Sequence, residues 1–174
     1  MTESEELSKE MSDEVADQLL KVRKIQAEEI EYGLGLNSFV CKLQSLDGRE
    51  QFSLDYGRSG ITLKYKLQCR ARTYVPLVRL EVNGGWHKNP RSAESGSPDS
   101  YSEHEFKPGE SHFHVYRHGY GDRWAYPVPE NTFTDLNDRM LTFKQFEDWC
   151  NIDHIKVIEE IKDHQHYIEK RERR

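Results

Sequence analysis

The chain has 174 residues, of which 35% are hydrophobic and 32% are charged, and its mean hydropathy is −0.91. This length predicts a single domain, and three dispersed cysteines predict a reducing compartment rather than a disulfide framework. No apolar run approaches the roughly 18 residues that a membrane-spanning helix needs, and the acidic start lacks a secretory signal, so we expect a cytoplasmic protein without a membrane partner.

Charge is divided unevenly along the chain. Residues 1–36 contain 4 basic and 10 acidic residues, residues 37–90 contain 9 and 4, and residues 91–174 contain 12 and 17. The basic middle segment predicts a surface for an anionic polymer, although ion pairs inside the fold would also explain the pattern.

The N-terminal segment predicts a tail followed by a helix. Residues 1–11 have no apolar stripe and are expected to be a disordered tail, while residues 12–174 are expected to form one domain. Ser12 is the expected N-cap of a helix that ends at Gly33 and Gly35.

A sheet is expected next, because apolar and polar residues alternate. Asp47-Gly48 has the composition of a tight hairpin turn between two such stretches. Further strands are expected over residues 61–70 and 74–83.

The second half of the chain begins with a long flexible loop, expected over residues 86–111. A strand follows over residues 111–117, and two prolines in residues 124–129 exclude a central strand there. Helices are expected to begin at Thr142 and near Asp153. Together these elements predict an α+β fold, an antiparallel sheet of about five to six strands with an N-terminal helix and two C-terminal helices.

The segment from His112 to Trp124 combines histidine, arginine, aspartate and aromatic residues at high density. If it is extended, His112, His114 and Tyr116 project from one face, and the two imidazoles stand about 7 Å apart. Such a pair can act as general base and general acid, as metal-independent RNA cleavage requires. The expected catalytic residues are His112, His114, Tyr116 and Asp122, with Arg117 and Arg123 binding phosphate.

Two other interpretations of the histidine pair remain open. A His-x-His pair can chelate a metal, with a further ligand from His118, Asp122, His87 or His104. The histidines can also be structural, bonded to neighbouring strands. The acid–base hypothesis needs no metal or cofactor. The adjoining Gly119–Asp122 segment is read as a tight turn, with an anion-binding nest as the alternative.

A row of cations is the second candidate site. Lys64, Lys66, Arg70 and Arg72 have the same parity in the predicted strand, so they are expected on one face. Such a row suits a sugar-phosphate backbone, but cations that protect an edge strand from aggregation would look the same.

The string HFHVYRHGYGDRWAYP, together with the upstream strands, resembles an uncharacterised family of small bacterial proteins, a domain of unknown function. In this family a His-x-His strand and a Gly-Tyr-Gly-Asp-x-Trp-Ala-Tyr-Pro turn occur together. The resemblance covers residues 37–152 approximately and implies a bacterial or phage source and a single α+β domain. It implies no activity, cofactor or functional residue.

These features favour a cytosolic bacterial protein that interacts with RNA or another nucleic acid, with a metal-independent ribonuclease of toxin type, as in toxin-antitoxin pairs, as its specific form. A non-enzymatic protein of phage or mobile-element origin, bound to a protein partner through its acidic terminal helices, is the alternative. A mononuclear metal enzyme is the third hypothesis.

Overall fold

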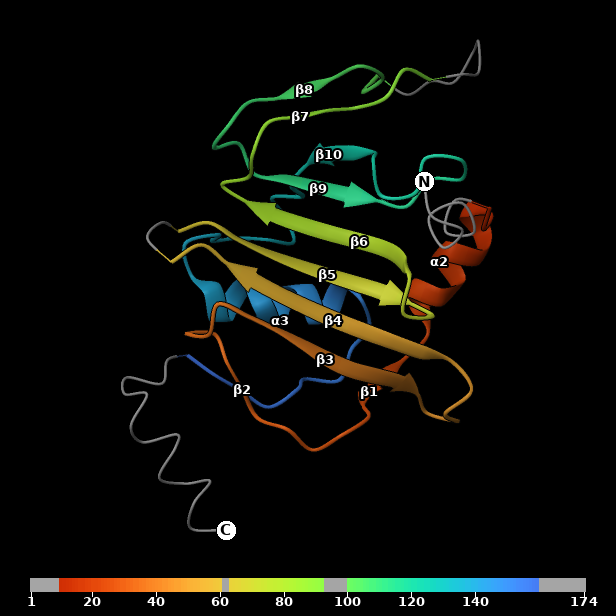
Figure 1. Ribbon diagram of the computed structural model, residues 1–174, viewed down its shortest axis with the longest axis vertical. Helices are drawn as coiled ribbons and strands as arrows, with labels where there is room; N and C mark the ends of the chain where they lie inside the picture. Colours follow the sequence, from red (N-terminus) through yellow and green to blue (C-terminus); the bar gives the residue numbers. More distant parts are fainter. Residues whose placement is uncertain (1–9, 61–62, 93–99, 160–174) are drawn as a thin grey trace.

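The computed structural model describes residues 10–60, 63–92 and 100–159. Its main feature is an antiparallel seven-stranded sheet in the order β1-β3-β4-β5-β6-β9-β10 (Figure 1). The strands of this sheet are β1 Lys24–Gln26, β3 Ser38–Ser45, β4 Gln51–Arg58, β5 Tyr65–Ala71, β6 Val75–Val82, β9 His112–Val115 and β10 Ala125–Pro127. Two further pairs of short strands are β2 Tyr32–Gly33 with β11 Val157–Ile158, and β7 His87–Lys88 with β8 Glu105–Phe106.

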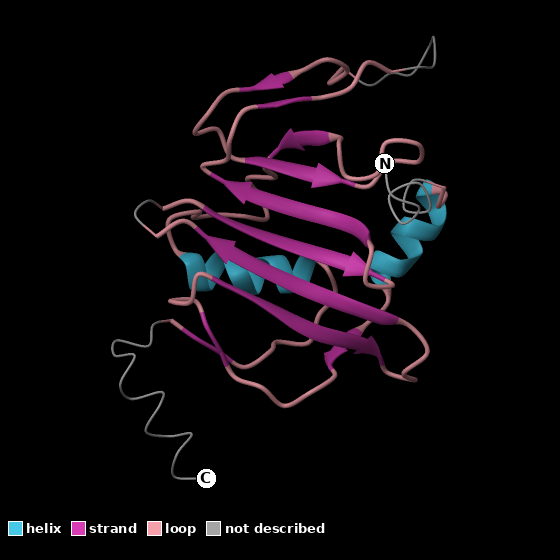
Figure 2. Cartoon of the chain, in the orientation of Figure 1, coloured by secondary structure: helices cyan, strands magenta, loops and turns pink. Residues whose placement is uncertain are grey.

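The predicted α+β fold class is wrong, because the described residues are mostly sheet (Figure 2). Within them there are two helices, α2 Asp13–Lys21 and α3 Arg139–Trp149. The expected helix from Asp153 is not formed in the described part, since β11 pairs there with β2. Of the apolar residues that suggested helical spacing, Ile155 is buried in the core without being helical, whereas Ile158 is exposed. Residues 160–174 lie outside the described residues.

Both helices begin at a side-chain cap, but only one cap was identified from the sequence. Ser12 Oγ accepts a hydrogen bond from Val15 N at 3.2 Å, as expected. In α3 the cap is Asp138, whose Oδ1 accepts from Leu141 N at 2.9 Å. Thr142 lies inside this helix, and its hydroxyl donates to a backbone carbonyl.

Helix α2 is also shorter than the prediction, which extended it to Gly33. It ends at Lys21, and the chain enters β1 at Lys24. The expected tail of residues 1–11 is described only from residue 10 onward.

The central strands confirm the predicted hairpin and show why the sheet has two different faces. Gly48 has a φ of +71°, and β3 pairs with β4 around it. On one face, apolar side chains from β3 to β9 pack on α3, where Phe113 contacts Trp149 with ring centroids 5.2 Å apart.

The strand expected over 61–70 begins only at Tyr65, and residues 61–62 are not described.

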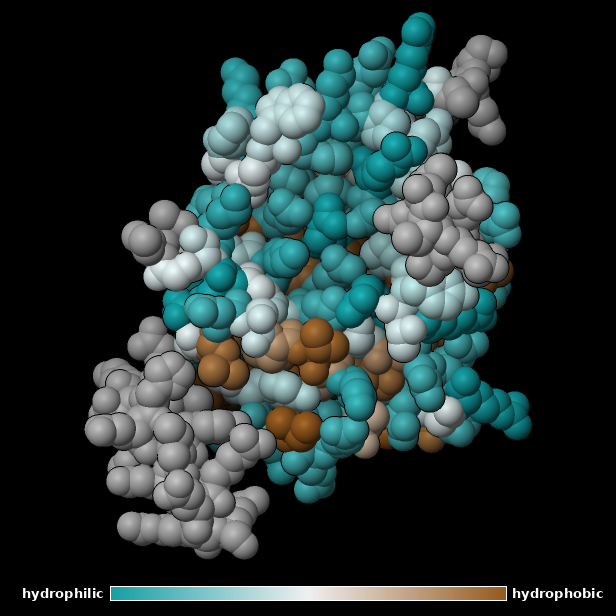
Figure 3. Space-filling view, in the orientation of Figure 1, coloured by the Kyte–Doolittle hydropathy of each residue, from teal (hydrophilic) through white to brown (hydrophobic). Residues whose placement is uncertain are grey.

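The opposite face of the sheet is polar. Register places Lys66, Glu81 and His112 side by side on β5, β6 and β9, and the next row contains Arg79 and His114. In the space-filling view of this face, hydrophilic residues cover most of the upper strands, and apolar patches gather in the lower half around β3 (Figure 3). The fold therefore places the two histidines in a row of charged residues, opposite the core.

A carboxylic acid is buried on the core side. The Glu147 side chain is fully buried, and Oε1 accepts a hydrogen bond from Ile155 N at 2.9 Å, while Oε2 has no hydrogen-bond partner within residues 10–60, 63–92 and 100–159. Burial raises the pKa of Glu147 to about 7. Because the folded pKa lies above the unfolded value, this group favours folding at low pH and loses that contribution as pH rises through about 7.

We therefore expect Glu147→Gln to remove a pH dependence of stability. The wild-type free energy of unfolding should fall by about 2–3 kcal/mol between pH 4.5 and 8 on account of this group, since one pKa unit corresponds to about 1.4 kcal/mol. Urea unfolding at both pH values measures the effect, with Glu130→Gln as an exposed control. An unchanged pH slope in Glu147→Gln would contradict the assignment.

Candidate metal site

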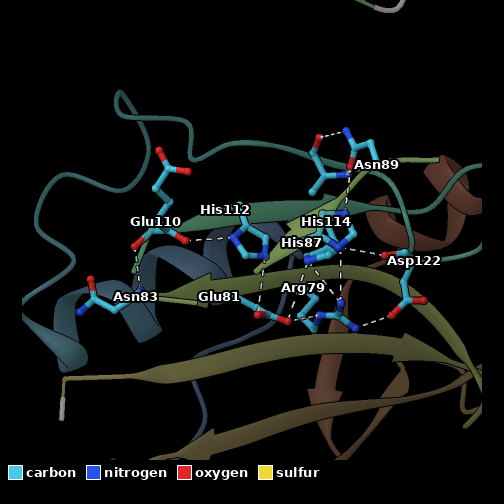
Figure 4. Close-up of polar contacts among 11 residues, drawn as sticks. Arg79, Glu81, Asn83, His87, Asn89, Glu110, His112, His114 and Asp122 are labelled. Carbon is cyan, nitrogen blue, oxygen red and sulfur yellow. Dashed lines mark hydrogen bonds and ion pairs between the residues drawn. The ribbon is translucent and has the colours of Figure 1, made fainter. Parts of the chain in front are cut away.

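Four polar side chains from two adjacent strands meet on the polar face. His112 and His114 extend from β9, and Arg79 and Glu81 extend from the neighbouring β6 (Figure 4). Both imidazoles are 1% exposed, whereas Glu81 is 24% exposed. The period of two in β9 explains this placement, since it turns Phe113 into the core and both histidines to the other face.

Backbone contacts fix the protonation of both imidazoles. His112 Nδ1 lies 3.0 Å from the carbonyl oxygen of Glu110, and His114 Nδ1 lies 2.8 Å from that of Asp122. A carbonyl oxygen can only accept, so each Nδ1 carries the proton and donates it. When the ring is neutral, this leaves the lone pair on Nε2. Metal-binding histidines are oriented by the same kind of hydrogen bond in metalloproteins.

The two Nε2 atoms face the carboxylate of Glu81. Glu81 Oε2 lies 3.6 Å from His112 Nε2, and Oε1 lies 3.8 Å from His114 Nε2. One ligand atom from each of the three residues lies within 4.8 Å of the others. Tetrahedral zinc with bonds of 2.0–2.1 Å places its ligands about 3.4 Å apart, so a small contraction of this group would form a two-histidine, one-carboxylate site.

The charges of the cluster leave a negative excess. Arg79 Nε lies 2.9 Å from Glu81 Oε1, and its Nη1 is paired with the carboxylate of Asp122. Arg79 Nη2 also lies 3.2 Å from His114 Nε2. One guanidinium thus faces two carboxylates and two neutral imidazoles, and His112 Nε2 is buried without a hydrogen-bond partner among the described residues. An additional cation would satisfy both the charge and the unpaired nitrogen.

Burial also keeps the imidazoles neutral. It lowers the pKa of His114 to about 2, with the nearby Arg79 charge as a further cause. It lowers the pKa of His112 as well, against the opposing effect of the hydrogen bond to Glu110. Neutral imidazole is the form that binds a metal, whereas general-acid catalysis needs a protonated ring near neutral pH.

A short hairpin covers the histidine rings. His87 of β7 stacks on His112 with ring centroids 5.5 Å apart and meets His114 edge-on at 4.6 Å, and Phe106 of β8 stacks on His112 at 5.0 Å. Buried Asn89 holds this cover, since it bonds His87 Nε2 and both backbone groups of Ala125. The segment predicted to be a flexible loop thus contains an ordered lid over the site.

A glycine makes the close packing of the cluster feasible. A Cβ on Gly84 would lie 2.6 Å from His112 Cε1 and 3.1 Å from Glu81 Oε2. Any larger residue at this position would have to displace a ligand of the candidate site.

Of the two other predicted catalytic residues, the structure separates Tyr116 from the histidine pair. Tyr116 follows the end of β9, is buried in the core cluster, and donates its hydroxyl to Met11 O at 2.8 Å. Tyr116 does not share a face with His112 and His114, as the alternation predicted, because it lies beyond the end of the strand. Asp122 does reach the cluster, through its backbone carbonyl and its ion pair with Arg79.

The predicted phosphate-binding arginines lie elsewhere, as do His118 and His104 of the proposed further ligands. Arg117 donates to the hydroxyl of Tyr126, and exposed Arg123 donates to a backbone carbonyl. His118 contacts the N-terminal segment, and exposed His104 lies against Phe106. Residues 119–122 form the expected tight turn, where Gly119 and Gly121 have positive φ angles and Gly121 N donates to Arg117 O.

The predicted row of cations is only partly available. Arg70 pairs with Asp55 at 2.8 Å and Arg72 with Glu50 at 3.4 Å. Lys64 and Lys66 are exposed and form no ion pair with the described residues. Protection of an edge strand is the wrong explanation for these cations, because β5 lies in the middle of the sheet.

Sequence reasoning missed Arg79, Glu81 and Asn89 as site residues. The signal for the first two was an alternation: they are the charged residues of one parity in the otherwise apolar strand VPLVRLEV. Nothing local distinguishes Asn89, because its backbone partners Tyr101 and Ala125 lie far away in the sequence.

Comparison with known proteins gives one match. A family described as a family of unknown function (DUF6978) matches residues 11–152. No curated protein and no solved structure matches. The expected resemblance to an uncharacterised domain is thus confirmed, while the recurring motif and the bacterial source stay predictions. Among the described residues, no helix is both long and apolar enough to cross a membrane.

Proposed function

The chain belongs to this family of unknown function, and from its site geometry we propose that it binds a divalent transition-metal ion through His112, His114 and Glu81. The observation that carries the proposal is the pair of buried Nε2 lone pairs that face one carboxylate, with no hydrogen-bond partner for His112 Nε2 in the described part of the chain. Imidazole and carboxylate ligands together suit zinc, iron(II) or manganese.

Three protein ligands are typical of catalytic rather than structural sites, because they leave a position for water or substrate. Glu81 is the most exposed of the three ligands, so the open position is on its side, while the hairpin covers the imidazoles. A metal there would act as a Lewis acid or lower the pKa of a bound water.

The ribonuclease hypothesis uses the same histidines without a metal. Both rings are 1% exposed and have lowered pKa values, which suits ligands better than an acid–base pair. Arg79 is the competing occupant of the site, since it already contacts His114 and Glu81. If it is the only cation required, the cluster is structural and takes up no metal.

Zinc titration of chelator-treated protein without a histidine tag tests the proposal. The wild type should bind one equivalent of zinc, and Glu81→Gln should weaken zinc binding by at least about tenfold. Loss of a residue that only orients a metal ligand already weakens metal binding by about 10- to 100-fold. His154→Asn, a change at an exposed histidine paired with Asp148, is the control. Equal affinity in Glu81→Gln and the wild type would exclude this carboxylate as a ligand.

A further inference from the structure

A concave site adjoins the histidine cluster on the polar face. Its volume is about 430 Å³, and Glu81 and Gly84 form the wall that it shares with the cluster. The remaining polar lining comes from the ends of β4 and β5 and from the turn before β3: Asn37, Arg58, Ser59, Lys64 and Lys66.

Three of the lining residues are cations, and none of the three forms an ion pair with the described part of the chain. Arg58 donates to the carbonyl oxygens of Gly35 at 2.6 Å and Leu36 at 3.2 Å, so its guanidinium is fixed by neutral acceptors. Lys64 and Lys66 form no ion pair with the described residues. Glu81 is the carboxylate in the lining and is also paired with Arg79, so three cations of the lining face one carboxylate.

The position of Lys66 is built into the sheet. It lies opposite Gly57 on β4, and a Cβ on that glycine would lie 3.4 Å from Lys66 Cε. The Lys66 side chain therefore lies in the space that the missing side chain of Gly57 leaves, and a larger residue at position 57 would crowd the lysine. Since β5 is a central strand, an exposed lysine here does not serve to block edge pairing.

We infer that this concave site binds a phosphate group, either the free ion or a phosphate monoester, held by Arg58, Lys64 and Lys66. Two ammonium groups, together with the guanidinium donors of Arg58 that do not bond Gly35 or Leu36, match a dianionic phosphate better than they match a single carboxylate. The inference rests on the proposed function only in placing the phosphate next to a metal ion, because Glu81 lines both sites. It uses Lys64 and Lys66, which were expected to contact nucleic acid, but for a dianionic phosphate rather than for the singly charged diester of a nucleic-acid backbone.

Calorimetric titration with inorganic phosphate and with adenosine 5′-monophosphate tests the inference. The wild type should bind at least one of the two, and Lys66→Met should weaken that binding by about tenfold, as expected for loss of one charge-assisted contact. Lys64→Met/Lys66→Met should weaken it further. Lys42→Met is the matched control, because Lys42 lies on the same face but pairs with Glu28.

The two ligands distinguish the source of the phosphate. Tighter binding of the nucleotide would identify a nucleotide ester, and binding of inorganic phosphate alone would identify the free ion. Binding of neither ligand, or equal binding in the wild type and Lys64→Met/Lys66→Met, would overturn the inference.

The metal and phosphate proposals can fail separately. Zinc binding should be unchanged in Lys66→Met, so loss of phosphate binding with one equivalent of zinc retained supports the phosphate site by itself. Conversely, lysine-dependent phosphate binding by a protein that takes up no zinc would keep the phosphate site and refute the metal site.

Discussion

His112→Asn/His114→Asn is expected to abolish zinc binding while the protein stays folded. The asparagine amide can take the place of Nδ1 and donate to the carbonyls of Glu110 and Asp122, but no atom replaces Nε2. The variant thus keeps the contacts that orient the residues and removes the two proposed ligands. Elemental analysis after zinc loading should show no bound metal, against one equivalent in the wild type.

A matched variant separates this result from a general effect of removing histidine. His104→Asn/His154→Asn makes the same change at two exposed positions outside the cluster and should retain one equivalent of zinc. Far-UV circular dichroism checks the fold. If the double variant does not fold, the single variants decide, each with an expected loss of affinity of at least about tenfold. A folded double variant that still binds zinc would refute the proposed ligands.

Lys24→Met is expected to cost about 3 kcal/mol or more in the free energy of unfolding. The Lys24 side chain is fully buried, and its ammonium donates to the carbonyls of Leu20 at 2.7 Å, Val22 at 2.8 Å and Cys150 at 2.7 Å. It also lies over the Phe52 ring, 4.7 Å from the centroid.

The cost follows from the position of these carbonyls. They lie at the C-terminal ends of α2 and α3, where the backbone acceptors have no partner within the helix. Methionine has similar length but no donor, so three buried acceptors would lose a charged partner, each at about 1–3 kcal/mol. Burial lowers the pKa of Lys24, and these carbonyls supply the compensating contacts.

Urea unfolding compares Lys24→Met with Lys42→Met, an exposed lysine whose ion pair with Glu28 should contribute less than about 1 kcal/mol. Equal stability of the two variants would show that the hydrogen bonds of Lys24 do not stabilise the C-terminal ends of α2 and α3.

Local patterns predicted the parts of the fold that depend on neighbouring residues. The Asp47-Gly48 hairpin and the Ser12 cap are examples, because their contacts are formed within a few residues. The C-terminal half of the predicted N-terminal helix was wrong because Lys24 is held by Cys150, a partner 126 residues away. β11 was missed for the same reason, since its partner β2 lies near the other end of the domain.

The candidate site, too, was predictable only where it depends on residues that are close in the sequence. Strand periodicity placed His112 and His114 on a common face, and the structure confirms that placement. It could not identify Glu81, because the neighbour of β9 depends on strand order. Parity also could not show that Arg70 and Arg72 are paired with Asp55 and Glu50, whereas Lys64 and Lys66 remain exposed.

The proposed metal site is tested most directly by X-ray absorption at the zinc edge of the loaded wild-type protein. The expected first shell contains only nitrogen and oxygen at about 2.0–2.1 Å, with the scattering of two imidazoles. Sulfur scattering near 2.3 Å, which would indicate one of the buried cysteines, would contradict the site, as would a shell without imidazole or a protein that retains no zinc.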